Sequence, residues 1–266
     1  MNSLNFSSCM APNMDGFCID LVQYLSKQTA FPVRTSLDMS WQNRERLFDA
    51  GEIQACWICG LPYVWKKDSF PEQFELLAAP VMKGKRYQNS PIYFSDVVVL
   101  EDSSYQKLDD LRGGSWAYNE PGSHSGYNVV RYSLAKRGES GAFFGRVIES
   151  GSHQASLSMI LQKEVDGAAI DSTVLELALK IDPSIRAKIK IIDTFGPSPI
   201  PPWVLSTRIP IEVRNKLMNI FLMMDKDPAG EKILAKIGMD HFAEVDDHWY
   251  DPIREMAKIA ETIQFA

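Results

Sequence analysis

Two histidines stand in Gly/Ser-rich turns, and these turns are the segments in which ligand chemistry is most readily predicted. The first contains Ser123, His124, Ser125 and Gly126; it follows the strand-like run Trp116–Asn119 and precedes apolar residues at helical spacing. Backbone N–H groups at a helix start lack intrahelical partners and, with nearby hydroxyls, can bind an anion. The alternative is that Ser123 or Ser125 only caps the helix.

Two further turns of this kind follow in the same stretch of chain. His153 comes after Gly151-Ser152, between a strand pattern and a helical one, where its ring can donate to an anionic oxygen. Asp171 ends a strand of small residues, where its carboxylate can accept from a ligand N–H or O–H or hold a neighbouring His. The alternatives are an N-cap for Asp171 and a merely structural His153. Two of the four histidines fall in equivalent turns, so we give binding and structural roles equal weight.

Other kinds of chemistry have little support. Cys56 and Cys59 have redox-motif spacing, but on a strand they would point to opposite faces, so we interpret the four cysteines mainly as small buried residues. Neither a Walker A loop nor zinc-ligand spacing is present. The run Gly122–Gly126 has His at its centre and is not a nucleophile elbow. We therefore expect no catalytic residue, no metal and no cofactor, and a protein that is not an enzyme.

The elements that must position these turns alternate along the chain. Strand patterns cover 4–9, 53–58, 96–100, 116–119, 147–149, 167–170, 189–194 and 203–206 and also lie near Val33, and helical patterns lie between and after them. This alternation predicts an α/β fold with mainly parallel sheets flanked by helices. Passages at 89–95 and 197–202 predict two hinge crossings: a discontinuous first lobe, 1–94 plus 201–266, and a second lobe, 95–200.

Composition excludes several classes of partner. With 28 Lys+Arg against 34 Asp+Glu, the net charge of −6 disfavours nucleic acid and anionic membranes. The chain has no apolar run of the roughly 20 residues that a membrane span needs. Residues 1–10 lack the pattern of a signal peptide, so either the protein is cytosolic or an export signal precedes this sequence.

A series of short motifs, in order, resembles the PhnD-like phosphate/phosphite/phosphonate solute-binding proteins of ABC transporters, which are type II periplasmic binding proteins. The resemblance covers nearly the whole chain. The segments that carry it are 11–13, 51–53, 60–63, 93–95, 108–113, 123–127, 151–153, 167–172, 199–201 and 227–230.

The resemblance implies a two-lobed type II periplasmic-binding-protein fold with a small phosphorus oxyanion (phosphonate, phosphite or phosphate) in the cleft between the lobes, and hinge closure. It implies that the first turn, through Ser123, His124, Ser125 and Gly126, holds the phosphoryl oxygens, that His153 donates another hydrogen bond, that Tyr93 closes from the hinge and that Tyr63 contributes from the first lobe.

Asp171 matches an acid that meets the ligand amine in aminophosphonate binders, but their second acid near the return hinge is missing from 196–201. Phosphate, phosphite or a simple alkylphosphonate is thus at least as well supported as an aminophosphonate. The implied partners are a small anionic ligand and a membrane ABC permease, for a monomer in the periplasm or anchored outside the cytoplasm. A cytosolic ligand-sensing domain or an enzyme on the same fold is the alternative.

Overall fold

The computed structural model describes residues 3–29 and 31–265. Within them the chain forms two compact units. The first unit runs to Ile92 and resumes over Pro199–Tyr250, and the second consists of Tyr93–Ser198 and the segment from Asp251 onward. In the part of the chain described here, no helix is long and apolar enough to cross a membrane.

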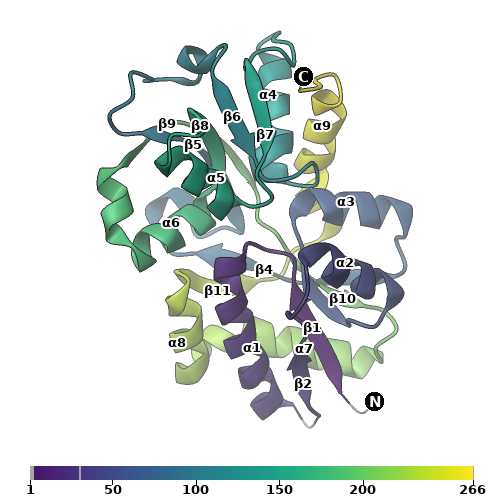
Figure 1. The fold of residues 1–266 in the computed structure, drawn as a ribbon. Coiled ribbons are helices and arrows are strands. Elements are labelled where there is room, and N and C mark those ends of the chain that lie inside the picture. The colour runs from purple at the N-terminus through teal and green to yellow at the C-terminus, as the bar shows by residue number, and fades with distance from the viewer. Residues whose placement is uncertain (1–2, 30, 266) are drawn as a thin grey trace. The chain divides into compact units, whose positions relative to one another are not determined.

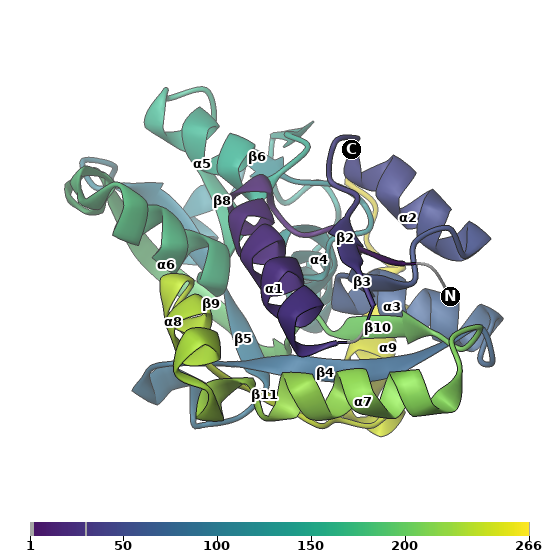
Figure 2. The same cartoon turned by 90° about the horizontal axis from the view of Figure 1, so that it is seen from below.

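The first unit is built on a six-stranded sheet in the order β11-β4-β10-β3-β1-β2 (Figure 1). Helix α7 packs against β4, and α8 packs against both α1 and β11 (Figure 2). The elements of this unit are β1 (Leu4–Ser8), α1 (Asp15–Gln28), β2 (Val33–Thr35), α2 (Trp41–Ala50), β3 (Ala55–Trp57), α3 (Gly60–Ser69), β4 (Phe74–Met82), β10 (Trp203–Ser206), α7 (Ile211–Leu222), α8 (Pro228–Lys236) and β11 (Met239–Ala243).

Aromatic rings pack against one another in the interior of the first unit. Trp57 and Trp203, on neighbouring strands, stack with ring centroids 5.7 Å apart and planes inclined by 17°. Local signals set the boundaries: Ser40 accepts from the Asn43 N–H at the start of α2, and Gly51 ends that helix with a φ of 80°, a conformation that favours glycine.

The second unit is built on a five-stranded sheet in the order β7-β6-β8-β5-β9 (Figure 1). Its apolar core includes Trp116, whose ring stacks on Phe144 at 4.5 Å, and the valines of β5. Its elements are β5 (Ile92–Leu100), β6 (Ser115–Tyr118), α4 (Val129–Lys136), β7 (Arg146–Glu149), α5 (His153–Leu161), β8 (Gly167–Asp171), α6 (Ser172–Ile181), β9 (Ile189–Pro199) and α9 (Asp251–Ala260).

The sheets are mixed, which corrects the expectation of mainly parallel sheets. β1 pairs in parallel with β2 and β3, and β6 pairs in parallel with β7 and β8. β10, however, is antiparallel to β3 and β4, β11 is antiparallel to β4, and β5 is antiparallel to β8. A buried strand is apolar whichever way it runs, so composition did not reveal the direction of these strands.

The C-terminal segment belongs to the second unit, whereas the sequence placed all of 201–266 in the first lobe. Helix α9 packs against α4, and the buried Arg131 Nε donates to the Ile263 carbonyl at 2.6 Å. The chain therefore passes between units at three points, 92/93, 198/199 and 250/251, instead of two. An amphipathic helix shows which of its faces is buried but not which neighbour buries it.

Three elements are absent from the sequence-based prediction: α3, β4 and β11. β4 is apolar almost throughout and contains Pro80, which argues against a strand when it is judged from sequence alone. β9 also runs on to Pro199, so the proline-rich passage begins as part of a strand.

Candidate functional site

The three polar turns lie at one edge of the sheet in the second unit. β6 runs parallel to both β7 and β8, so the carboxyl ends of all three strands meet at that edge. A helix starts after each of them: α4 after the first turn, α5 at His153 and α6 after Asp171. β5 is antiparallel to β8, with Ser95 opposite Asp171, so the start of β5 also reaches this edge.

The first turn folds into a short π-helix, His124–Asn128, before α4. Ser123 is its cap, since its Oγ accepts from the Gly126 N–H at 3.0 Å. Ser123 therefore caps this short helix, and its predicted contact with a ligand stays a prediction. The turn is also tied to β5, because the Ser95 hydroxyl donates to the Ser125 carbonyl at 2.6 Å.

Position 126 has room only for a glycine, because atoms of neighbouring residues lie where a side chain would begin. A Cβ at this position would lie 1.8 Å from Asn119 Oδ1 and 3.1 Å from His153 Cε1. Any larger residue would push apart the first and second turns. The glycine thus brings the two histidine-containing turns into contact.

Ser125 and His153 form the centre of the cluster. The Ser125 Oγ lies 2.9 Å from His153 Nε2, and both side chains are buried. Burial lowers the pKa of His153 to about 4, with a smaller opposing effect from the backbone of Ala169. The imidazole is therefore neutral at pH 7, and its hydrogen bond joins two uncharged groups.

One buried polar atom of this cluster, Asn119 Oδ1, has no hydrogen-bond partner among the described residues. Asn119 is 8% exposed and His153 7% exposed. Almost all buried polar atoms in proteins are paired, so an unpaired oxygen in this cluster is typical of a site that a ligand or ordered water completes.

Both ring nitrogens of His124 lie within hydrogen-bond distance of a protein side chain. Its Nδ1 lies 3.1 Å from Asn128 Nδ2 and its Nε2 lies 3.0 Å from Ser198 Oγ. The side chain is fully buried, and burial lowers its pKa to about 3. Both ring nitrogens therefore contact protein groups, and the contact of this turn, including its backbone N–H groups, with phosphoryl oxygens stays a prediction.

Asp171 caps α6, as the structural alternative predicted. Its Oδ1 accepts from the Thr173 N–H at 2.8 Å and from the Thr173 hydroxyl at 2.7 Å. Burial raises the pKa of Asp171 to about 6, although the bonds from Thr173 act in the opposite direction. One carboxylate oxygen is therefore engaged in holding the helix start.

The two predicted tyrosines lie in different units. Tyr93 begins the second unit and is buried, with its ring centroid 6.4 Å from that of His124. Tyr63 is fully buried in the first unit, where its hydroxyl donates to Asp247 at 2.7 Å and its ring packs on Tyr250.

Sequence reasoning did not select Asn119, Asn128 or Ser198 as site residues. Asn119 is the last residue of a predicted strand, and a polar residue at that position is a signal that was available. Asn128 looks like an ordinary helix residue. Ser198 lies among prolines far along the chain and reaches His124 only through the tertiary fold.

The cysteines lie in or beside the first unit's sheet and helix α1, and all four are free thiols. The Cys56 Sγ lies 3.6 Å from Cys9 Sγ, and burial raises the pKa of the Cys56 thiol. Residues 3–29 and 31–265 contain no group of three or more His, Cys, Asp or Glu side chains placed to hold a metal ion.

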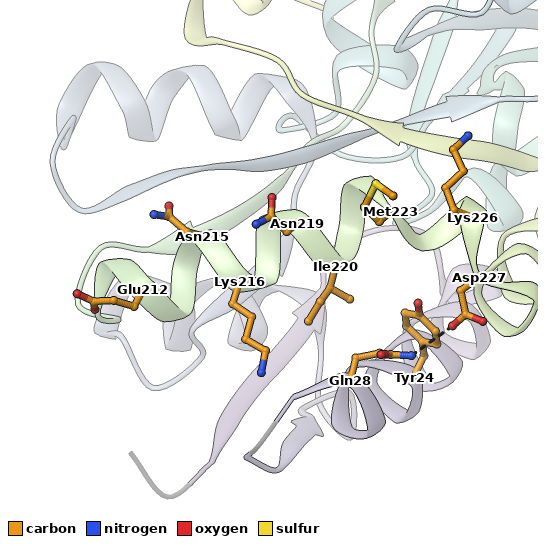
Figure 3. A pocket seen from close by; sticks show the side chains of 10 residues that line it. All are labelled: Tyr24, Gln28, Glu212, Asn215, Lys216, Asn219, Ile220, Met223, Lys226 and Asp227. Carbon is orange, nitrogen blue, oxygen red and sulfur yellow. Dashed lines mark hydrogen bonds between the residues drawn. The ribbon is translucent and has the colours of Figure 1, made fainter.

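A separate open pocket of about 780 Å³ lies in the first unit, between α1 and α7 (Figure 3). Two acids line it, Glu212 and Asp227. Asp227 is already engaged: Gln28 donates to it at 3.2 Å, and its other oxygen caps α8 through the Ala229 N–H. Tyr24 also bonds to Asp227, and burial together with this carboxylate raises the Tyr24 pKa to about 12. None of the ligand-binding residues predicted from the sequence lines this pocket.

Comparison with known proteins identifies the class to which this fold and cluster belong. Residues 18–250 match the family described as "ABC transporter, phosphonate, periplasmic substrate-binding protein". The chain belongs to this family, whose members bind solutes for transport. The identification agrees with the resemblance found in the sequence motifs.

Individual relatives support the same assignment. The chain is 27% identical over 180 residues to the "Phosphonates-binding periplasmic protein" of Escherichia coli; the alignment covers 65% of this chain and 52% of the relative, so it spans about half the length of that protein.

Two solved structures show the fold. A binding protein component of an ABC phosphonate transporter from Pseudomonas aeruginosa has a TM-score of 0.85 at 20% identity, covering 97% of this chain and 86% of its own. PhnD1 from Prochlorococcus marinus, solved in complex with methylphosphonate, has a TM-score of 0.86 at 18% identity, covering 98% and 99%. The chain thus has the type II periplasmic-binding-protein fold.

Proposed function

We propose that this protein is the extracytoplasmic binding component of an ABC transporter and that it takes a small phosphorus oxyanion to a membrane permease. The observation that carries the proposal is the cluster at the edge of the second unit's sheet, where Ser125 and His153 meet at the carboxyl ends of the parallel strands β6, β7 and β8. N-terminal helix turns, hydroxyls and a neutral imidazole are suited to the oxygens of a phosphonate. The family and the methylphosphonate complex of PhnD1 support the same ligand class.

The ligand that fits best is an oxyanion without a cationic amine. One oxygen of Asp171 holds the start of α6, and the return strand presents Ser198 in the segment where a second acid was missing from the sequence. Methylphosphonate, phosphite and phosphate therefore rank above aminoethylphosphonate.

The cluster has no cationic side chain to balance the ligand's charge. Arg131, the buried cation among the described residues of this unit, donates to the Ile263 carbonyl and stacks on the Tyr127 ring at 4.6 Å. Binding therefore rests on oriented dipoles, and the loss of a single donor should be costly.

Isothermal titration calorimetry with methylphosphonate, phosphite, phosphate, aminoethylphosphonate and sulfate tests the proposal. We expect Ser125→Ala and His153→Ala each to weaken binding by about tenfold or more, since a hydrogen bond to a charged group contributes roughly 1.5–3 kcal/mol. Ser158→Ala, on α5 but outside the cluster, is the matched control and should bind like the wild type. Wild-type protein that binds none of the phosphorus oxyanions would overturn the function, and cluster variants that bind normally would overturn the site.

A further inference from the structure

The direction of hydrogen bonding around His124 can be worked out from its neighbours. The Asn128 amide nitrogen can only donate, so the His124 Nδ1 must accept at 3.1 Å. Burial lowers the pKa of this imidazole to about 3, so the ring is neutral and its single proton is on Nε2. That N–H then donates to Ser198 Oγ at 3.0 Å.

This order of bonds leaves the Ser198 hydroxyl proton to point elsewhere. A hydroxyl has one proton and two lone pairs, and one lone pair is taken up by His124. Ser198 is 4% exposed and is therefore a buried donor with a fixed acceptor side.

The position of Ser198 brings it to the edge of the sheet that holds the candidate site. Ser198 lies near the end of β9, which neighbours β5. A Cβ on Gly196 would meet the Tyr93 carbonyl at 3.2 Å, so this end of β9 lies against the start of β5. The start of β5, in turn, lies opposite the carboxyl end of β8.

We propose that Ser198 is a further ligand-binding residue, which donates its hydroxyl proton to the phosphorus oxyanion, and that His124 is a positioning residue that acts through it. The inference rests on the proposed function, since it names an additional donor in the same site. It explains why a histidine in the first turn is buried with both nitrogens bonded: it sets the direction of a donor on a distant strand.

A double-mutant cycle with methylphosphonate as the probe tests this relation. We expect Ser198→Ala to weaken binding by about tenfold and His124→Leu to weaken it by a similar factor. In the Ser198→Ala background, His124→Leu should cause no further loss. His124→Gln, whose amide can still donate to Ser198, should retain most of the affinity. A structural role for His124 would instead give effects that multiply.

A measurement on the unliganded wild-type protein covers the case in which a His124 variant fails to fold. Nuclear magnetic resonance of isotope-labelled histidine should show His124 neutral and protonated on Nε2. Protonation on Nδ1 would overturn the proposal, because Ser198 would then donate to the ring.

The outcomes separate this inference from the function on which it rests. If Ser125→Ala weakens methylphosphonate binding and Ser198→Ala does not, the inference is wrong and the function stands. If the wild-type protein binds no phosphorus oxyanion, both are wrong. Ser158→Ala again serves as the matched control.

Discussion

Buried polar side chains are distributed unevenly between the two units. Among the described residues, every buried polar or charged side chain lies in the second unit except Ser7, Ser8, Arg44 and Ser206. These four bond within the first unit; Arg44, for example, forms a two-point contact with Asp15 and donates to backbone carbonyls. Around them the interior is apolar and contains packed aromatic rings.

The second unit instead gathers serines, histidines and an asparagine at the ends of its strands and leaves the buried Asn119 Oδ1 unpaired. Burying an unpaired polar atom costs roughly 1–3 kcal/mol. In the first unit the unpaired buried atom Trp203 Nε1 lies among aromatic rings instead, so the polar cluster that we propose as the binding site lies in the second unit. The following predictions test that division of roles.

A pair of glycine substitutions should have opposite effects in the two units. In Gly126→Ala the new Cβ would clash with Asn119 and His153, so we expect a loss of about 1–3 kcal/mol in the free energy of unfolding and of at least tenfold in methylphosphonate affinity. Gly16→Ala, in α1 with nothing within 4 Å of the added Cβ, should be stabilised by up to about 0.5 kcal/mol. Urea unfolding and calorimetry measure both effects. A Gly126→Ala protein as stable and as active in binding as the wild type would show that the turns are not closely packed.

The buried histidines should make the protein sensitive to mild acid. Their folded-state pKa values, about 3 for His124 and about 4 for His153, lie below the ordinary value of 6.5, so the unfolded chain binds more protons below pH 6.5. The stability that comes from keeping these two histidines neutral is therefore fully present above pH 6.5. It is lost as the pH falls from 6.5 toward their folded-state pKa values. At pH 5 the loss is about 2 kcal/mol per histidine.

Asp171 acts in the opposite sense, because its raised pKa of about 6 makes the folded state bind more protons than the unfolded chain between pH 6 and 3.8. Urea unfolding at pH 7 and pH 5 should show that the free energy of unfolding of the wild type falls between these pH values. For His153→Gln we expect this fall to be about 2 kcal/mol smaller. His241→Gln, on β11 in the first unit and in contact with solvent, is the control that should follow the wild type. Equal losses in all three proteins would mean that His153 titrates as an exposed group does.

Removing the hydroxyl from each of the two tyrosines that were predicted to bind the ligand should have the smallest effects. Tyr63→Phe removes the bond to Asp247, so we expect the free energy of unfolding to fall by about 1 kcal/mol and methylphosphonate affinity to stay unchanged. Tyr93→Phe should weaken binding several-fold, as its place beside His124 in the second unit suggests. Weaker binding by Tyr63→Phe would instead bring the first unit into the site and end the division of roles.

Local patterns in the sequence were sufficient for much of this protein. The strands predicted over 4–9, 116–119 and 203–206 are present as β1, β6 and β10, because apolar runs and the turn residues that bound them act over a few residues. The three polar turns were also found from sequence, since each follows a strand and precedes a helix. The ordered motifs indicated the family that the comparison then established.

Only the tertiary structure decided what depends on contacts between distant segments. The directions of β10 and β11, the packing of α9 on the second unit and the contact of Ser198 with His124 join residues that are far apart in the chain. No local pattern records such a pairing, because an apolar face or a hydroxyl is compatible with many partners. Whether a turn histidine faces a ligand or a neighbouring side chain is decided in the same way, by which groups the fold brings within 3 Å of its ring nitrogens.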